Sequence, residues 1–101
     1  MHIKNIVVFA KGDKGIDRSP CGTGTSAQLA ALYAKGQIKL NQNSTHESII
    51  GTIFTGKVTG RTKVNGLEAI IPEITGSAYT TGIHTFVLSP HDPLGHGFLI
   101  E

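Results

Sequence analysis

Residues 17–27 contain the only cysteine of the chain, set among glycines, small hydroxyl residues and one acidic-basic pair. In order they read Asp17-Arg18-Ser19-Pro20-Cys21-Gly22-Thr23-Gly24-Thr25-Ser26-Ala27. They lead into a helix pattern, and the first N–H groups of a helix lack intrahelical partners while its dipole adds positive potential. A carboxylate or phosphate could therefore bind the amides of Gly22 and Thr23. Because the same field stabilises a thiolate, Cys21 is predicted to be a reactive thiol beside an anion site.

Two other interpretations of this stretch need to be weighed. A lone cysteine is often a buried, small apolar residue, but a position between Pro20 and Gly22 at a helix start favours reactivity. Residues 22–27 also fit the G-x-G-x-x-A dinucleotide fingerprint. That fingerprint needs a strand running straight into the glycines and a βαβ unit. A polar loop precedes these glycines and hairpin signals follow the helix, so nucleotide binding is a weak prediction.

Asp17 has two candidate roles. It could accept hydrogen bonds from nearby loop amides, the commonest role of Asp ahead of a helix. Alternatively, an amino acid held by its carboxylate at Gly22 and Thr23 needs a negative group for its ammonium, and Asp17 could supply it. Arg18 is interpreted as a structural pairing residue, since the amides already serve the carboxylate.

The bulk composition limits the classes of protein. The chain has 101 residues, 39% of them hydrophobic and 16% charged, which suits one small globular domain. The net charge of +2 is spread along the chain, so no nucleic-acid partner is expected. A single cysteine excludes an internal disulfide and fits a reducing cytosol. No segment is long enough for a membrane span, so the expected location is cytoplasmic. The spacing of His84, His91 and His96 matches no metal site.

The periodicity predicts one helix and several mostly antiparallel strands, hence an α+β fold. The helix pattern of 27–35 is apolar almost all round, which predicts burial on most sides by sheet, with Gly36 as the residue after its C-cap. The dipeptide Asn65-Gly66 is a hairpin signal. Strands are expected at 3–9, 49–64, 67–74 and 77–88, with bends at the glycines Gly51, Gly56, Gly60 and Gly82.

Residues 17–27 resemble the second catalytic signature of the proline racemase family, which includes 4-hydroxyproline 2-epimerases and trans-3-hydroxyproline dehydratases. The resemblance continues through Ile74-Thr75-Gly76-Ser77-Ala78-Tyr79-Thr80-Thr81-Gly82 and Asp92-Pro93-Leu94-Gly95-His96-Gly97-Phe98. It covers essentially the whole chain, but family members are longer and carry a first catalytic cysteine in a Met-Cys-Gly-His signature. This chain contains no such signature, so residues 1–101 resemble one partial, C-terminal domain.

The resemblance implies a diaminopimelate-epimerase-like fold, with a curled sheet around a central helix and some partner strands missing. It implies a cofactor-independent racemase or epimerase of proline or 4-hydroxyproline, in which two cysteines exchange the α-proton. Cys21 would be one of them, Gly22 and Thr23 would bind the substrate carboxylate, and Asp17 its ammonium. Several dehydratases of the family carry Thr at the position of Cys21, which makes that activity the less favoured one.

The resemblance also implies partners. The missing cysteine would come from a complementary N-terminal half or from a second copy in a homodimer. The alternative is a catalytically incomplete fragment or subunit that binds a carboxylate ligand or completes a partner chain. An aromatic residue lines the ring pocket in the family, but Phe9 lies two residues too far from Asp17 for a firm match.

Overall fold

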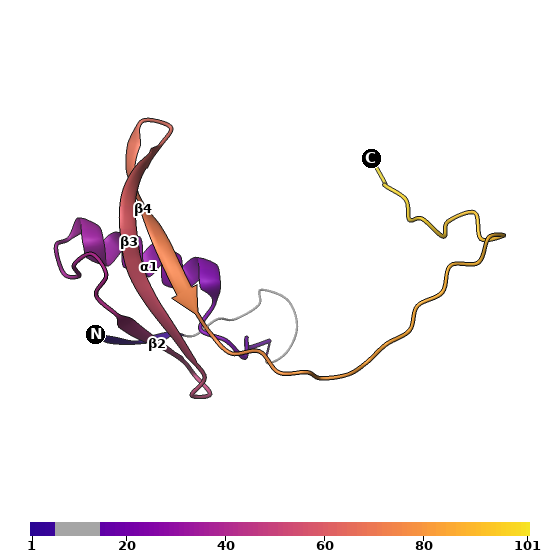
Figure 1. Ribbon diagram of the computed structural model, residues 1–101, viewed down its shortest axis with the longest axis horizontal. Helices are drawn as coiled ribbons and strands as arrows, with labels where there is room; N and C mark the ends of the chain where they lie inside the picture. Colours follow the sequence, from indigo (N-terminus) through magenta and orange to yellow (C-terminus); the bar gives the residue numbers. More distant parts are fainter. Residues whose placement is uncertain (6–14) are drawn as a thin grey trace.

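Four strands form a single mixed sheet in the order β1-β2-β3-β4 (Figure 1). The computed structural model describes residues 1–5 and 15–101. Strand β1 pairs parallel with β2, whereas β2–β3 and β3–β4 are antiparallel. With the helix α1 this confirms a small α+β fold. The elements in chain order are β1 (His2–Asn5), α1 (Gly22–Ala34), β2 (Ser44–Ser48), β3 (Ile53–Val64) and β4 (Leu67–Thr75).

The hairpin between β3 and β4 forms at the predicted place. Asn65 and Gly66 adopt positive φ values of 51° and 77°, as a two-residue type I′ turn requires. The register shifts between Val58 and Gly60, so the predicted bend at Gly60 is a β-bulge. The predicted strand 49–64 is wrong at its start, because residues 49–51 turn the chain from β2 into β3. Most of the strand predicted at 3–9, including Phe9, lies outside the described residues.

Helix α1 begins at Gly22, earlier than the 27–35 pattern indicated. Its end is as predicted: Gly36 has a φ of 70°. The Gly36 amide donates to the Tyr33 carbonyl at 3.0 Å and the Gln37 amide to the Leu32 carbonyl at 2.8 Å, the bond pair of a Schellman motif. Within the described part of the chain, no helix has the length and apolar character needed to cross a membrane.

The expectation that sheet surrounds α1 is wrong for this chain. Only Thr25 and Leu29 of the helix are buried. One side of α1 packs against β3 and β4, and the described residues provide no second layer for the other side. The core is accordingly small. Its buried apolar residues are Leu29, Ile38 and Val58, with Leu32, Tyr33, Ile70 and Ile74 packed around them.

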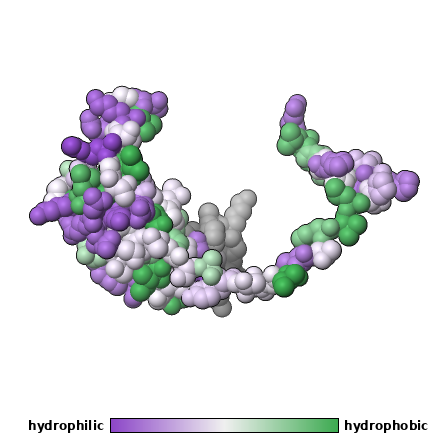
Figure 2. Space-filling view, in the orientation of Figure 1, coloured by the Kyte–Doolittle hydropathy of each residue, from purple (hydrophilic) through white to green (hydrophobic). Residues whose placement is uncertain are grey.

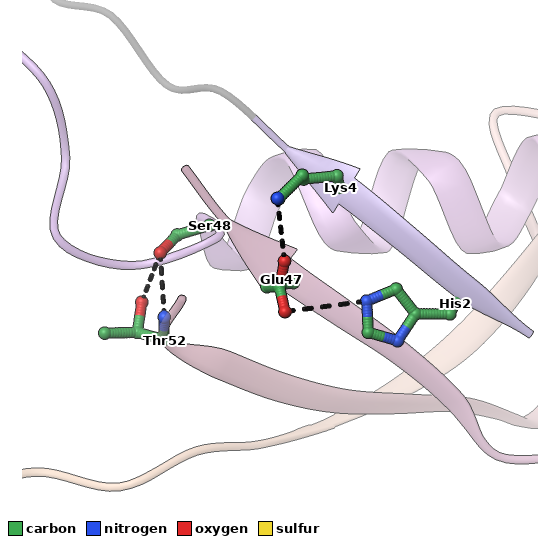
Figure 3. A network of polar contacts seen from close by, with 5 residues as sticks. All are labelled: His2, Lys4, Glu47, Ser48 and Thr52. Carbon is green, nitrogen blue, oxygen red and sulfur yellow. Dashed lines mark hydrogen bonds and ion pairs between the residues drawn. The ribbon is translucent and has the colours of Figure 1, made fainter. Parts of the chain in front are cut away.

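Strand β2 was not expected, because its sequence Ser-Thr-His-Glu-Ser lacks an apolar alternation. Its inward-facing side chains, Ser44, His46 and Ser48, are buried although polar. On its outer face Glu47 contacts Lys4 (3.1 Å) and His2 (3.7 Å) of β1 (Figure 3). The His2 and Lys4 side chains are exposed and Glu47 is only partly buried, so these pairs add little stability. The register of β2 is set by its inward side.

The chain after β4 contains no strand, so the strand predicted at 77–88 is wrong. Residues 76–101 leave the sheet along an extended path and end far from it (Figure 1). An extended segment becomes a strand only beside another strand that shares its backbone hydrogen bonds, and no described residue lies there to do so. Residues 77–100 are called the C-terminal arm below.

Helix and sheet lie close together at Gly56, which predicts the effect of adding one methyl group there. A Cβ at Gly56 would lie 2.9 Å from Leu29 Cδ1 and 3.3 Å from Ile74 Cδ1. We expect Gly56→Ala to lower the free energy of unfolding by about 1–3 kcal/mol, measured by urea denaturation.

The matched control is Gly60→Ala in the same strand, whose Cβ would meet only Ile71 Cδ1 at 3.4 Å. Because Ile71 is half exposed and can yield, we expect a change within about 0.5 kcal/mol. Equal losses for both variants would contradict the close-packing account.

Candidate functional site

Cys21 is the N-cap of α1, and its thiol lies at the start of the helix. Its Sγ accepts a hydrogen bond from the Gly24 amide at 3.4 Å, and its carbonyl accepts from the Thr25 amide at 3.0 Å. The φ and ψ angles of Cys21 are 71° and 126°. A non-glycine residue at positive φ is strained by about 1–3 kcal/mol and is often found at functional sites. The sequence predicted the place of this thiol, but not its strain.

The amides of Gly22 and Thr23 open the helix, as predicted. In the described part of the chain neither donates to a protein acceptor. Both residues are exposed, and a Cβ added at Gly22 would meet nothing within 4 Å beyond its chain neighbours. Together with the dipole of a 13-residue helix, these open amides can hold a small anion beside the thiol.

A series of side chain to backbone hydrogen bonds shapes the loop ahead of the helix. Asp17 Oδ1 accepts from the Ser19 amide at 3.0 Å, and Ser19 Oγ accepts from the Cys21 amide at 3.1 Å. Asp17 therefore has the loop role that was one of its two interpretations. A carboxylate has acceptor sites beyond one such bond, so this contact is compatible with the second interpretation, binding of an ammonium group.

The loop is fastened to the turn between β2 and β3. Thr52 Oγ1 donates a hydrogen bond to the Arg18 carbonyl. The Thr52 amide donates to Ser48 Oγ at 3.0 Å, and the two hydroxyl oxygens lie 2.6 Å apart in a second hydrogen bond (Figure 3). The Arg18 guanidinium lies 5.8 Å from the ring centre of Tyr79, a cation–π distance. Arg18 is thus a pairing residue, as predicted, but its partner in the described chain is an aromatic ring.

A cavity of about 640 Å³ adjoins this loop without reaching the thiol. Its wall combines the loop, the β2–β3 turn and the first residues after β4: Arg18, Ser19, Gly51, Thr52, Ile53, Phe54, Ser77, Ala78 and Tyr79. Cys21, Gly22 and Thr23 are not part of it. The concave space therefore lies beside the helix start, where Gly22 and Thr23 are exposed.

His46 of β2 is the residue that sequence reasoning missed. It is fully buried; its Nδ1 lies 3.1 Å from Gln28 Oε1 of α1 and its Nε2 lies 3.0 Å from Ser44 Oγ. Since an amide oxygen only accepts, Nδ1 carries the proton and Nε2 accepts from Ser44. Burial lowers the pKa of His46 below 6.5, and the charges of His2 and of the N-terminal ammonium lower it further. The histidine is a neutral link between sheet and helix.

The remaining histidines form no centre. His84, His91 and His96 are exposed in the C-terminal arm, and His84 stacks on Phe86 with 6.0 Å between ring centres. Over residues 1–5 and 15–101 there is no group of three His, Cys, Asp or Glu side chains placed to hold a metal ion.

Comparison with known proteins gives one consistent family. The profile of the family described as Proline racemase matches residues 1–99. The chain is 56% identical over 97 residues to a proline racemase of Acetoanaerobium sticklandii, covering 96% of this chain and 28% of that protein. It is 50% identical over 100 residues to a probable 4-hydroxyproline 2-epimerase of Rhizobium meliloti, covering 99% of this chain and 29% of that protein.

Solved structures give the same result for the fold. A hydroxyproline epimerase from Agrobacterium vitis, crystallised with bound trans-4-OH-L-proline, superposes with a TM-score of 0.75 at 45% identity. That match covers 96% of this chain and 27% of the other. The chain thus spans a little under a third of the length of the curated relatives that it matches.

The buried His46 predicts a pH dependence of stability. The fold favours the neutral ring, whereas the unfolded chain binds the proton with an ordinary pKa near 6.5. The stability contributed by the neutral ring is therefore complete above pH 6.5 and is lost as the pH falls below it. We expect the free energy of unfolding to fall between pH 6.5 and 5 in the native sequence, measured by urea denaturation.

His46→Gln should be less stable at pH 7.5 but should show a flatter profile in this window, because it removes the titrating group. His91→Gln, at an exposed position, is the matched control and should keep the native slope. An unchanged slope in His46→Gln would assign the pH dependence to other groups.

Proposed function

Because the chain belongs to the proline racemase family, we propose that it supplies one acid/base group, Cys21, for racemisation or epimerisation of proline or 4-hydroxyproline. The observation that carries this proposal is the placement of the Cys21 thiol at the helix start, beside the open amides of Gly22 and Thr23. A thiol and a carboxylate site within one turn of each other fit proton exchange at the α-carbon of an amino acid.

In the proposed complex the substrate carboxylate binds the amides of Gly22 and Thr23 at the positive end of α1. The substrate ammonium pairs with the carboxylate of Asp17, on acceptor sites that the Ser19 amide does not use. These two contacts turn the α-carbon toward Cys21. They also stabilise the charge that develops on the carboxylate when the α-proton leaves, which is how fixed dipoles lower such a barrier without a cofactor.

The reaction needs two groups because inversion removes and adds protons on opposite faces of one carbon. The Cys21 thiolate takes the α-proton and becomes a thiol, leaving the electron pair delocalised into the carboxylate. A second thiol on the other face gives its proton to the carbon and becomes a thiolate. The reverse direction exchanges the two roles. No oxidant, metal or cofactor enters this balance.

The sequence contains one cysteine, and this favours a second candidate function for the chain in isolation. By itself the chain would be a catalytically incomplete subunit that binds a carboxylate ligand or completes a partner. The second thiol would come from a complementary N-terminal half, or from a symmetric homodimer in which two copies of Cys21 face one ligand. The open side of α1 supports the related proposal that the full assembly encloses the helix in a diaminopimelate-epimerase-like sheet.

The proposed role predicts how Cys21 reacts. Because Cys21 stands at the helix start and its Sγ accepts from the Gly24 amide at 3.4 Å, we expect iodoacetamide to label native Cys21 at pH 7 faster than in the urea-unfolded chain. Pyrrole-2-carboxylate, a planar mimic of the carbanion, should slow this labelling, whereas benzoate should protect less.

The control is a Cys21→Ser/Thr62→Cys variant, which moves the thiol to an exposed strand position. Its labelling should be insensitive to unfolding and to pyrrole-2-carboxylate. Native Cys21 labelling at the same rate as this variant would contradict the proposed activation.

The requirement for two thiols predicts that a monomer of this chain does not racemise proline. One thiol reaches only one face, so it can exchange the α-proton for deuterium without inverting the carbon. In D₂O, with monomer verified by sedimentation, we expect optical rotation to persist while deuterium enters the α-position, detected by mass spectrometry.

Cys21→Ser should slow the deuterium exchange by roughly 100-fold or more, because the substitution removes the general base. Loss of optical rotation by a verified monomer would disprove the two-thiol mechanism. Exchange that persists in Cys21→Ser would remove Cys21 from the proposed site.

A further inference from the structure

Among the hydrogen bonds of the described residues, one joins a side chain of helix α1 to the sheet. His46 of β2 is fully buried, and its Nδ1 lies 3.1 Å from Gln28 Oε1 of α1. The other buried polar side chain of the helix, Thr25, has no hydrogen-bond partner for its Oγ1 in the described part of the chain. The bond from His46 to Gln28 is therefore the directional contact between helix and sheet.

Ser44 holds the histidine ring in the orientation that this bond needs. Its Oγ lies 3.0 Å from His46 Nε2, which leaves the Nδ1 proton for the amide oxygen of Gln28. A buried polar network whose members are all satisfied makes a core rigid and specific. Two apolar side chains of the same shape could fill this space at nearly equal stability, so what the polar pair adds is direction.

The apolar contact between α1 and the sheet is close but flat. It lies over Gly56, where a Cβ would be 2.9 Å from Leu29 Cδ1 and 3.5 Å from Thr25 Cγ2. Because Gly56 has no side chain, the sheet presents no ridge there, and ridges seated in grooves are what fix the orientation of packed helices. Figure 2 shows the C-terminal arm standing clear of the main body, so the arm does not cover the helix. The rotation of α1 about its axis therefore depends on the polar pair.

The thiol lies at the end of the helix face that carries this pair. Residues three and four positions apart share one face of an α-helix, and Cys21, Thr25 and Gln28 have this spacing. The helix has 13 residues and Cys21 is its N-cap. Because its backbone is hydrogen-bonded throughout, a rotation that moves Gln28 away from β2 also turns the helix start.

Cys21 connects two segments that are each attached to the sheet side of the molecule. The helix after it is held by β2, and the loop before it is held by the bond from Thr52 Oγ1 to the Arg18 carbonyl. Between them, Ser19 is hydrogen-bonded at both its amide and its hydroxyl, and the ring of Pro20 fixes its φ. A rotation of the helix relative to the loop therefore changes the backbone angles of Cys21. Its φ of 71° is a strained value that persists only where the surroundings hold it.

From this geometry we propose that His46 is a positioning residue for the Cys21 thiol. Its bond to Gln28 fixes the rotation of α1 on the sheet and so keeps Cys21 in its strained conformation, with Sγ at the Gly24 amide. A side-chain atom about 5 Å from the helix axis moves by about 2 Å when the helix rotates by about 20°. A misplacement of about 1 Å can slow a reaction by about 100-fold. The inference rests on the proposed function only for the reaction that the thiol performs.

The test removes the hydrogen-bond acceptor in the full 101-residue chain. Gln28→Met keeps the length of the side chain but replaces its amide with a thioether, a weak acceptor, whereas Gln28→Glu keeps an acceptor oxygen. Ile38→Val shortens a buried side chain of the same core and controls for a loss of stability alone. Two measurements are made without substrate: the amide NMR resonances of residues 22–24, and the rate at which iodoacetamide labels native Cys21.

We expect Gln28→Met to shift the resonances of residues 22–24 and to slow the labelling of Cys21 by roughly threefold or more, because the thiol leaves the Gly24 amide. Gln28→Glu should label at the native rate. Ile38→Val should keep native resonances and a native rate although it unfolds at a lower urea concentration. Native behaviour of Gln28→Met, or equal changes in Ile38→Val, would overturn the proposal. A slow rate in Gln28→Glu would overturn it too, since the acceptor is present there.

His46→Leu tests the histidine itself, and the Gln28 variants decide the proposal if this variant does not fold. The double variant His46→Leu/Gln28→Met should label no more slowly than the slower single variant, because both substitutions remove the same bond. Losses that add would give the two residues separate effects and overturn the proposal.

The fate of the proposed function is read separately. A chain that responds to Gln28→Met as expected, yet exchanges no α-proton of proline, would support the positioning role of His46 while contradicting the proposed function. Exchange at the native rate in Gln28→Met would overturn the positioning role and leave the proposed function intact.

Discussion

The contact between helix α1 and strand β3 determines the geometry of the rest of this chain. Leu29 is fully buried and lies over Gly56, where a Cβ would be only 2.9 Å from its methyl group. A strand residue without a side chain lets the helix axis come close to the sheet. Eight residues before Leu29, Cys21 is the N-cap of the same helix, so the position of the thiol relative to the sheet follows from this contact. The link from His46 to Gln28 supports it from β2.

At the helix start, local bonds and strain are concentrated in five residues. Three side chains accept a hydrogen bond from a backbone amide two or three residues later in the chain: those of Asp17, Ser19 and Cys21. Cys21 also has a positive φ of 71°. Since a strained N-cap is unfavourable by itself, packing elsewhere must hold it. The bond from Thr52 to the Arg18 carbonyl does this from the sheet side. The open amides of Gly22 and Thr23 follow directly from the same loop shape.

Local signals in the sequence predicted those structural features that depend on a few residues adjacent in the chain. The Asn65-Gly66 turn, the Schellman end at Gly36 and the helix-start cysteine each follow from backbone preferences of a few residues, and all are found. The elements that depend on distant partners were not predicted. Strand β2 buries polar side chains, and the partner of His46 is Gln28 of α1, which lies 18 residues earlier in the chain. The strain at Cys21 and the ring under Arg18 likewise arise from tertiary contacts.

The two wrong predictions about burial have a single physical cause. The apolar helix pattern and the β-branched segment 77–88 each predict an element that packs against neighbours on more than one side. In the structure α1 is covered by the sheet on one side only, and residues 77–88 are exposed. Both errors vanish if further polypeptide encloses α1 and pairs with the arm, since the sequence patterns then describe the enclosed state. The conflict between local pattern and observed exposure lies at the open side of α1 and along residues 79–88. Both elements adjoin the loop that presents Cys21, since α1 begins directly after Cys21 and Tyr79 contacts Arg18.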